Sequence, residues 1–266
     1  MTSAPASISP CGKAPSGATP ETCRPIPISS GTGRIGRLAL AARRVVDLQL
    51  CTIWRFISPS LRAMNGHVLD VGCGEMPFRH AVSATARYTG IDVPEATSFG
   101  MGGHADIVPF DGRRIPFADD SFEHILCTEV LEHSLDPQAL IDEMLRVLRP
   151  GGELVATIPF SARVHHAPYD FNRFTRYQLA RMFAGFGDVE IVARGSDLPV
   201  IANKLITLGW RLARPSWSLP LRLPALTCVG LAVAAFLPAA HLSILFDTGS
   251  KDDPLGYGIR AYKNRA

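Results

Sequence analysis

The residues best suited to chemistry are an acid and two glycines in the stretch "DVGCG", which begins at Asp70. Glycine lets the backbone approach a ligand closely or adopt a positive φ, and the turn here consists of Gly72, Cys73 and Gly74. The Asp70 carboxylate could hold a cation, and a second acid, Asp92, follows after 22 residues. An acid at that distance can accept hydrogen bonds from both hydroxyls of a ribose. On these residues alone, a cradle for a small molecule and a plain turn after a strand are equal alternatives.

The elements that must position these residues alternate along the chain from His67 onward. Six runs predict strands, at 67–73, 87–93, 122–130, 152–159, 188–195 and 256–264. Helices are expected at 175–187 and at 136–152, where Asp136 caps the start and the Pro150-Gly151-Gly152 run ends the helix. This alternation predicts an α/β fold with a Rossmann-like, doubly wound, mostly parallel sheet. Ligands bind such sheets beyond the carboxyl ends of the strands, where both acids lie.

Three later segments change the balance between cradle and turn. They read "YTGIDV" at 88–93, "DGRRIPFADDSFEHILCTEVLEHS" at 111–134 and "LRVLRPGGELVATIP" at 145–159. With "VLDVGCGEMPF", their order and spacing resemble class I S-adenosylmethionine-dependent methyltransferases, in particular the type 11 family. The resemblance covers about 65–195, roughly half the chain, and favours the cradle. It also implies that the last strand, 256–264, is antiparallel.

The resemblance implies S-adenosylmethionine as the cofactor and gives roles to individual residues. Asp70 and the glycine turn would hold the methionine portion, and Asp92 the ribose hydroxyls. Asp111 with Gly112 would read the adenine amino group, although Asp111 could instead be only a turn residue. The implied cofactor-binding set is Asp70, Gly72, Cys73, Gly74, Asp92, Asp111, Gly112, Thr128 and Glu129. Glu123 is a mild departure, because many relatives have Asp there.

A general base is needed only if the methyl acceptor must lose a proton. The segment "RVHHAPYDFNRFT" resembles a loop that lies near the acceptor in many type 11 relatives, so His165 is the first catalytic candidate and His133 the second. His133 could instead pack against the following helix, and Asp170 with Arg173 could form a salt bridge that fixes the loop. No metal is expected, because adjacent histidines rarely aim at one ion and no carboxylate stands at helical ligand spacing.

Two nucleotide-binding alternatives are weaker. The dinucleotide pattern needs a third glycine after Gly74, but position 77 is Pro. The run "GTGRIG" at 31–36 fits that pattern formally, yet it follows a Pro-rich tail rather than a strand. Residues 1–33 are rich in Pro, Ser, Gly and Thr, and we expect them to be disordered. An organelle transit peptide remains open there, whereas no apolar run of a secretory signal follows Lys13.

Charge is distributed unevenly along the chain. Residues 34–62 carry a net charge of +5, residues 66–195 carry −7, and residues 201–246 carry +4. An acidic centre argues against a nucleic-acid groove, whereas basic, apolar flanks fit contact with a membrane surface. The six cysteines are scattered without a C-x-x-C pair, so we expect reduced thiols and a cytoplasmic protein that could associate with a membrane.

The predicted division has three parts: a disordered tail at 1–33, a basic amphipathic helical segment at 34–64, and a methyltransferase domain at 65–266 with an apolar helical insert at 199–250. The insert contains 22 residues without a charge, 225–246, which is long enough to span a bilayer. A single crossing is excluded if the flanking strands share one sheet, so a packed lid and a monotopic membrane dock through 34–62 and 201–246 stay open.

The sequence therefore predicts a methyltransferase that acts on a small, apolar or lipid-linked acceptor and not on nucleic acid. The alternative is a non-catalytic cofactor-binding or membrane-scaffold protein that keeps the fold. The acceptor and the oligomeric state are not predicted.

Overall fold

The computed structural model describes residues 34–101, 105–213 and 219–265, so the tail predicted to be disordered lies outside the described residues. Its centre is one seven-stranded sheet with the order β3-β2-β1-β4-β5-β7-β6. The strands are β1 (His67–Val71), β2 (Arg87–Asp92), β3 (Val108–Pro109), β4 (Phe122–Thr128), β5 (Leu148–Pro159), β6 (Asp188–Arg194) and β7 (Gly256–Tyr262). The pairs from β3 to β5 are parallel, and β7 is antiparallel to both β5 and β6. This confirms the predicted Rossmann-like fold and its antiparallel last strand.

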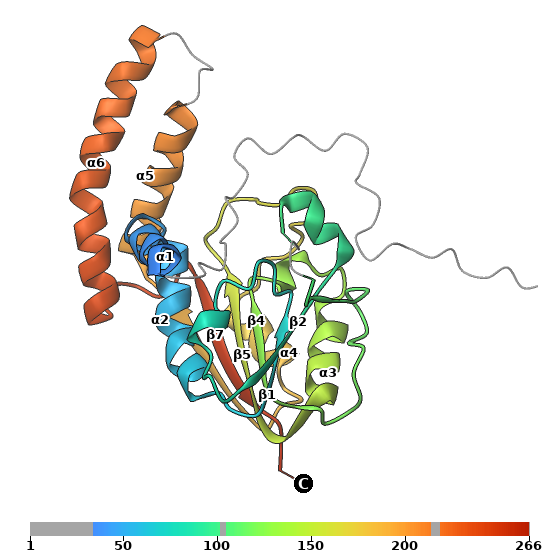
Figure 1. Cartoon of the computed structure of the whole chain (residues 1–266). Helices are drawn as coiled ribbons and strands as arrows, with labels where there is room; N and C mark the ends of the chain where they lie inside the picture. Colours follow the sequence, from blue (N-terminus) through green and yellow to red (C-terminus); the bar gives the residue numbers. More distant parts are fainter. Residues whose placement is uncertain (1–33, 102–104, 214–218, 266) are drawn as a thin grey trace, which may run out of the picture.

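Helices cover both faces of this sheet (Figure 1). The α-helices are α1 (Arg34–Val46), α2 (Leu48–Ala63), α3 (Pro137–Val147), α4 (Arg176–Met182), α5 (Asp197–Ala213) and α6 (Leu219–Phe246). Short 3₁₀ helices are η1 (Arg79–Ala81), η2 (Pro94–Phe99) and η3 (Leu131–His133). The two hydrophobic cores lie on opposite faces because side chains alternate along each strand: Leu69 of β1 packs with α3 and α4, and Val68 packs with α2.

The segment before the sheet, predicted as one basic amphipathic helical segment at 34–64, is divided into two helices. It consists of α1 and α2, with Asp47 between them as the N-cap of α2, where its Oδ1 accepts the N–H of Leu50 at 3.0 Å. The apolar face of α2 buries Ile53, Ile57 and Leu61 against the sheet. Removing one such buried side chain typically costs about 2–5 kcal/mol. The helix is therefore a layer of the fold, while the predicted domain division at 64/65 stays a prediction.

The predicted start of α3 is confirmed, whereas its predicted end is wrong. Asp136 caps the helix by accepting the N–H of Ala139 at 3.1 Å, as expected. The helix ends at Val147, however, and the "LRPGG" run that was predicted to end it belongs to β5. A side chain at Gly152 would meet the Glu123 carbonyl oxygen of β4 at 2.9 Å, so the glycine permits close pairing of the two strands.

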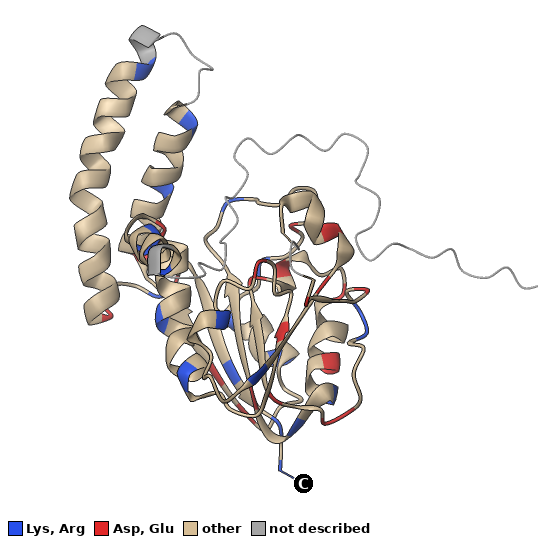
Figure 2. Cartoon of the chain, viewed as in Figure 1, with Lys and Arg blue, Asp and Glu red and all other residues tan. Residues whose placement is uncertain are grey.

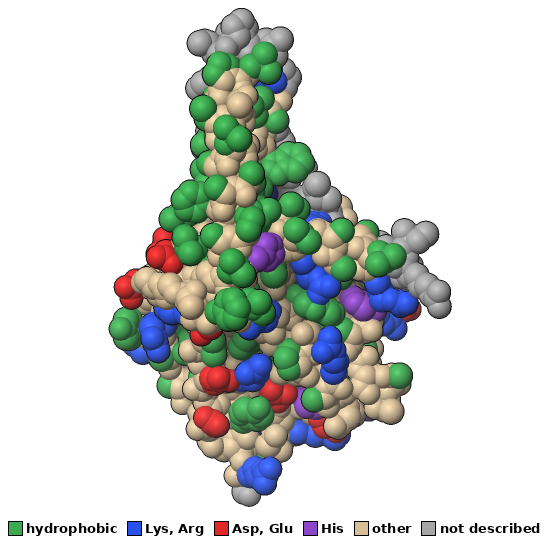
Figure 3. All heavy atoms as spheres, turned by 90° about the vertical axis from the view of Figure 1, so that its left-hand side faces the viewer, with side chains coloured by type: hydrophobic (Ala, Val, Ile, Leu, Met, Phe, Trp, Pro, Cys, Tyr) green, Lys and Arg blue, Asp and Glu red, His purple; other side chains and the backbone are tan. Residues whose placement is uncertain are grey.

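The apolar insert is a hairpin of α5 and α6 that projects from the domain (Figure 1). Its base packs on the domain through Val200 and Ala202 of α5, Ala240 and Ile244 of α6, and Leu255. Both ends of the hairpin return to one sheet, because it connects the neighbouring strands β6 and β7. Charged side chains are almost absent from α6 (Figure 2), and hydrophobic side chains cover the projecting surface (Figure 3).

Candidate functional site

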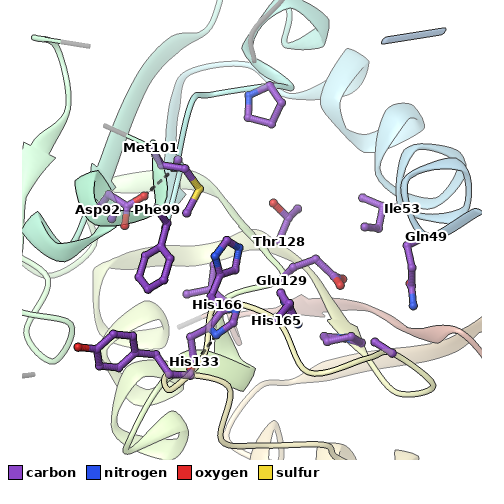
Figure 4. A pocket seen from close by; sticks show the side chains of 18 of the residues that line it. Gln49, Ile53, Asp92, Phe99, Met101, Thr128, Glu129, His133, His165 and His166 are labelled. Atoms are coloured by element: carbon purple, nitrogen blue, oxygen red, sulfur yellow. Dashed lines mark hydrogen bonds between the residues drawn. The ribbon is translucent and has the colours of Figure 1, made fainter. Parts of the chain in front are cut away.

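A cavity of about 790 Å³ lies at the carboxyl ends of the parallel strands. Of the predicted site residues it is lined by Gly72, Cys73, Gly74, Asp92, Gly112, Thr128, Glu129, His133 and His165 (Figure 4). Asp70 and Asp111 are not among the residues that line it. The structure therefore brings together nine of eleven predicted residues from five separate segments, because parallel strands deliver their loops to the same edge of the sheet.

The glycine turn needs its glycines for two separate reasons. Gly72 has a φ of +66°, and a Cβ there would lie 2.4 Å from Cγ2 of Val130. Gly74 has a φ of +50°, and its N–H donates to Oδ2 of Asp92 at 2.7 Å. Residues with a side chain rarely adopt such φ values. With glycine at both positions, the backbone itself forms the wall of the cavity. This is the geometry expected of a cradle.

Asp70 lies buried behind the turn rather than in the cavity wall. Its Oδ2 accepts a hydrogen bond from the Tyr88 hydroxyl, while its Oδ1 is buried without a hydrogen-bond partner among the described residues. Burial raises the pKa of Asp70 to about 7, although the Tyr88 hydrogen bond opposes the shift. A buried acceptor without a donor is costly, so this oxygen fits a site that is completed by a bound molecule.

Asp92 stands at the end of β2 on the cavity wall. Besides Gly74, it binds the N–H of Val93 through Oδ1 at 2.7 Å. Burial raises its pKa, and the hydrogen bonds from these two backbone groups oppose that shift. A carboxylate held at both oxygens has a fixed orientation, as binding of a ribose diol requires.

Asp111 lies in a turn, as the alternative to an adenine-binding role predicted. It is exposed, and its Oδ1 accepts the N–H groups of Arg113 at 2.9 Å and Arg114 at 2.7 Å. Burial is the largest single influence and acts to raise the pKa of Asp111, but the backbone N–H groups together outweigh it and lower the pKa. Gly112, the next residue, does line the cavity. The adenine role of Asp111 stays a prediction.

Glu129 lines the cavity, and its carboxylate makes a contact that the sequence did not predict. Its Oε1 accepts a hydrogen bond from Nη2 of Arg194 at 2.8 Å, and Arg194 is itself buried at the end of β6. The guanidinium also donates to the carbonyl oxygens of Ile158 and Tyr257, at 3.2 Å and 3.1 Å. An arginine at the end of an apolar strand was the only sequence signal for this pair.

His133, His165 and His166 lie together at the cavity (Figure 4), and the acids Glu132 and Asp170 lie beside them. Nδ1 of His165 lies 3.1 Å from Oδ2 of Asp170, and Nε2 lies 3.6 Å from Oε1 of Glu132. Burial works against a charged ring, but these two acids outweigh it and raise the pKa of His165 to about 10. His166 is the reverse case, because burial and the other two histidines lower its pKa to about 4. Glu132 was missed by the sequence analysis.

The loop that carries His165 is fixed by a salt bridge. Asp170 accepts from both terminal nitrogens of Arg173, at 2.5 Å and 2.8 Å, and from the backbone N–H of His165 at 2.9 Å. These bonds hold the pKa of Asp170 well below its usual range even though burial opposes them. The predicted Asp170–Arg173 salt bridge is confirmed. The catalytic roles of His165 and His133 stay predictions.

Comparison with known proteins gives the site its context. Residues 69–156 match the family model described as a methyltransferase domain. This segment, a third of the chain, resembles a methyltransferase domain. It contains the glycine turn, Asp92, Glu129 and Glu132, so the match covers most of the residues around the cavity but not α2, His165 or the hairpin.

Two curated relatives resemble the methyltransferase domain. The tRNA U34 carboxymethyltransferase of Nautilia profundicola is 32% identical over 111 residues, which are 38% of this chain and 37% of that protein. An uncharacterized methyltransferase of Mycobacterium marinum is 42% identical over 91 residues, which are 32% and 36% of the two chains. The chain thus spans little more than a third of the length of these relatives.

One solved structure with this fold is the phosphoethanolamine N-methyltransferase 2 of Haemonchus contortus, in complex with phosphomonomethylethanolamine and S-adenosylhomocysteine. It is 14% identical, with a TM-score of 0.47, and the likeness covers 86% of this chain and 57% of that one. The residues present fit S-adenosylmethionine, the cofactor that the sequence resemblance implies. The glycine cradle supplies space for the backbone to approach its polar groups, and the fixed Asp92 carboxylate supplies an acceptor on the cavity wall.

Proposed function

We propose that this chain is an S-adenosylmethionine-dependent methyltransferase that acts on an apolar or lipid-linked small molecule. The observation that carries this proposal is the extent of the cavity. It begins at the glycine turn and continues to apolar side chains of α1, α2 and α5, namely Val46, Leu50, Ile53, Ile206 and Trp210. One cavity therefore has a polar end for the cofactor and an apolar end suited to an apolar acceptor.

The bound cofactor would supply a methyl group that its sulfonium already activates. What the chain must do is hold the acceptor in line and exclude water. The apolar wall from α2 and α5 serves the second task, and the loop fixed by Asp170 and Arg173 serves the first. His133 and His165 line the cavity between them and are the predicted groups for moving a proton from the acceptor.

The hairpin supports a membrane surface as the source of the acceptor. Within Arg222–Phe246 of α6 the most apolar 18-residue window has a mean hydropathy of 2.0, yet only 11% of that window is buried within the chain. A helix that is apolar on all sides and exposed to solvent calls for an apolar environment. Arg211 lies in the last turn of α5 and Arg222 in the first turn of α6, while α1 carries Arg37 and Arg44. Anionic lipids attract such basic residues.

The same hairpin argues against a full crossing of the bilayer. The 17 residues of α5 reach only about 25 Å, and its first turns pack on the domain or line the cavity. A monotopic dock that inserts into one leaflet is therefore proposed, with the protein on the cytoplasmic side. In this arrangement α5 could serve as a lid as well, because Trp210 and Ile206 face the cavity.

Two measurements test this proposal. Calorimetry with S-adenosylhomocysteine should show binding, and lipid extracts incubated with an isotopically labelled methyl donor should yield a labelled apolar product. Absence of cofactor binding would refute the methyltransferase proposal. Binding without any labelled product, in lipid or aqueous extracts, would instead favour the non-catalytic alternative.

Sedimentation with anionic lipid vesicles tests the dock. The exposed side chains Leu231 and Leu242 of α6 are replaced together by Asp, and Tyr177→Asp on α4 is the control because that side chain is also exposed. We expect the wild type and the control to pellet with vesicles and the α6 variant to stay in the supernatant. If the wild-type chain does not pellet with vesicles and instead sediments as a dimer in solution, a second copy of the chain covers α6.

A further inference from the structure

Glu132 is the most unusual polar group of the described residues. Its side chain is fully buried in η3, and neither carboxylate oxygen accepts a hydrogen bond from the part of the chain that the structure describes. A buried carboxylate without donors is strongly unfavourable. Its backbone carbonyl does accept N–H groups from Phe171 and Asn172, so the residue is firmly placed and its side chain is not merely misoriented at a loose loop.

Two imidazoles face this carboxylate. Nε2 of His133 and Nε2 of His165 each lie 3.6 Å from Oε1 of Glu132, and the three donor atoms lie within 4.8 Å of one another. This separation is too long for a hydrogen bond. It matches the distance between two ligands of one ion, because atoms bound about 2.1 Å from a tetrahedral centre lie about 3.4 Å apart.

The far nitrogen of each imidazole has a partner that sets its tautomer. Nδ1 of His133 lies 2.8 Å from the Tyr169 carbonyl oxygen, which can only accept a hydrogen bond. Nδ1 of His165 lies 3.1 Å from the Asp170 carboxylate. A metal ion that binds either ring displaces its Nε2 proton, and the partner at Nδ1 then keeps the remaining proton there, so the Nε2 lone pair is free for the ion. Histidine ligands of metal ions show this arrangement of outer partners.

We propose that Glu132, His133 and His165 bind a divalent transition-metal ion of the Zn²⁺ or Fe²⁺ class. Two imidazoles and one carboxylate suit these ions and leave coordination positions open. The open side faces the cavity, because His133 and His165 both line it. The sequence predicted no metal, because adjacent histidines rarely aim at one ion and no carboxylate stands at helical ligand spacing. The fold instead joins η3 to a loop 32 residues later in the chain.

The site has a consequence for the acceptor, and this consequence rests on the proposed methyl transfer. An acceptor hydroxyl that coordinates the ion at its open position would have a lowered pKa. Such an acceptor would release its proton to solvent on binding and would bind as an oxygen anion, so His133 and His165 would serve as ligands and not as bases. Binding of the metal itself does not depend on this role.

Titration with Co²⁺ tests the site, because this ion substitutes for Zn²⁺ and absorbs visible light when bound in a low-coordinate site. The full chain without an affinity tag is freed of metal by a chelator and then titrated. We expect visible absorption that saturates at a single equivalent and that excess Zn²⁺ abolishes. Glu132→Gln and His165→Asn should each weaken Co²⁺ binding at least ~10-fold.

His124→Asn is the matched control. Nδ1 of His124 lies 3.5 Å from Oε2 of Glu153, so it also forms a histidine–carboxylate pair, but among the described residues no third donor completes it. Saturation in this variant should equal that of the wild type. Circular dichroism and S-adenosylhomocysteine binding establish that each variant is folded. If Glu132→Gln does not fold, His165→Asn alone tests the metal site.

Two results would overturn the proposal. One is wild-type chain that gives no saturable absorption with Co²⁺. The other is absorption that persists unchanged in folded Glu132→Gln and His165→Asn, which would place the ion on other groups such as the cysteine thiols. Either result with intact cofactor binding leaves the methyltransferase proposal standing, whereas loss of cofactor binding alone leaves the metal site standing.

Discussion

Gly74 and Asp92 are joined by a hydrogen bond of 2.7 Å from the backbone N–H of the first to Oδ2 of the second. The bond links the turn after β1 to the end of β2, two strands that are paired in parallel register. Because both groups line the cavity, this link fixes the separation between the two ends of the cofactor site.

Replacement of Asp92 by Ala should therefore weaken cofactor binding. The change removes the ribose acceptor and frees the Gly74 N–H, so the Kd for S-adenosylhomocysteine should rise about 10–100-fold. Calorimetry measures the change, with Asp188→Ala at the exposed start of β6 as the control. An unchanged Kd would show that the carboxylate serves only the turn.

Gly72→Ala should destabilise the fold and abolish cofactor binding. The new Cβ would meet Val130 at 2.4 Å at a φ of +66°, and strain of both kinds typically costs about 1–3 kcal/mol. Gly230→Ala is the control, since nothing lies within 4 Å of a Cβ there and the residue is inside α6. Urea unfolding should show a loss for Gly72→Ala and no loss for Gly230→Ala, and equal stability of the two variants would contradict the prediction.

Asp70 should make the stability of the chain depend on pH. Its pKa is about 7 when folded, against about 3.9 when unfolded. The folded state holds this proton more tightly, so the contribution of Asp70 is complete below about pH 4 and is lost as the pH rises to about 7.

Asp70→Asn removes that loss. The unfolding free energy of the variant relative to wild type should rise by about 2–4 kcal/mol between pH 4 and pH 7 and then level off. Urea unfolding at several pH values measures the difference, with the exposed Asp188→Asn as the control. A difference that does not change with pH would show that Asp70 is not protonated in the folded chain.

Arg194→Met should destabilise the chain because it leaves the Glu129 carboxylate without its partner. Arg194 is buried and Glu129 is partly exposed at the cavity, so a cost of about 2–4 kcal/mol is expected. Adding Glu129→Gln should recover a large part of this loss, and a double-mutant cycle by urea unfolding measures the coupling. Strictly additive losses would mean that Arg194 acts through its carbonyl contacts alone.

Much of the fold could be predicted because its signals are local. The strand that ends in Asp70, the cap at Asp136 and the hairpin's apolar sequence all depend on neighbouring residues, and the structure contains each of them. The two-residue strand β3 was missed, since a run this short has no periodicity. The end of α3 was placed too late, because "LRPGG" extends β5 only through its pairing with β4 and β7.

The sequence by itself determined the α/β order, the glycine cradle and the acids at the ends of β1 and β2, since each is written in a short stretch of the chain. Only the tertiary structure decided that Glu132 meets His165 across two loops, that Arg194 reaches Glu129, and that α5 borders the cavity. These approaches join residues 33 or more positions apart. They are set by how helices and strands pack, which no local spacing records.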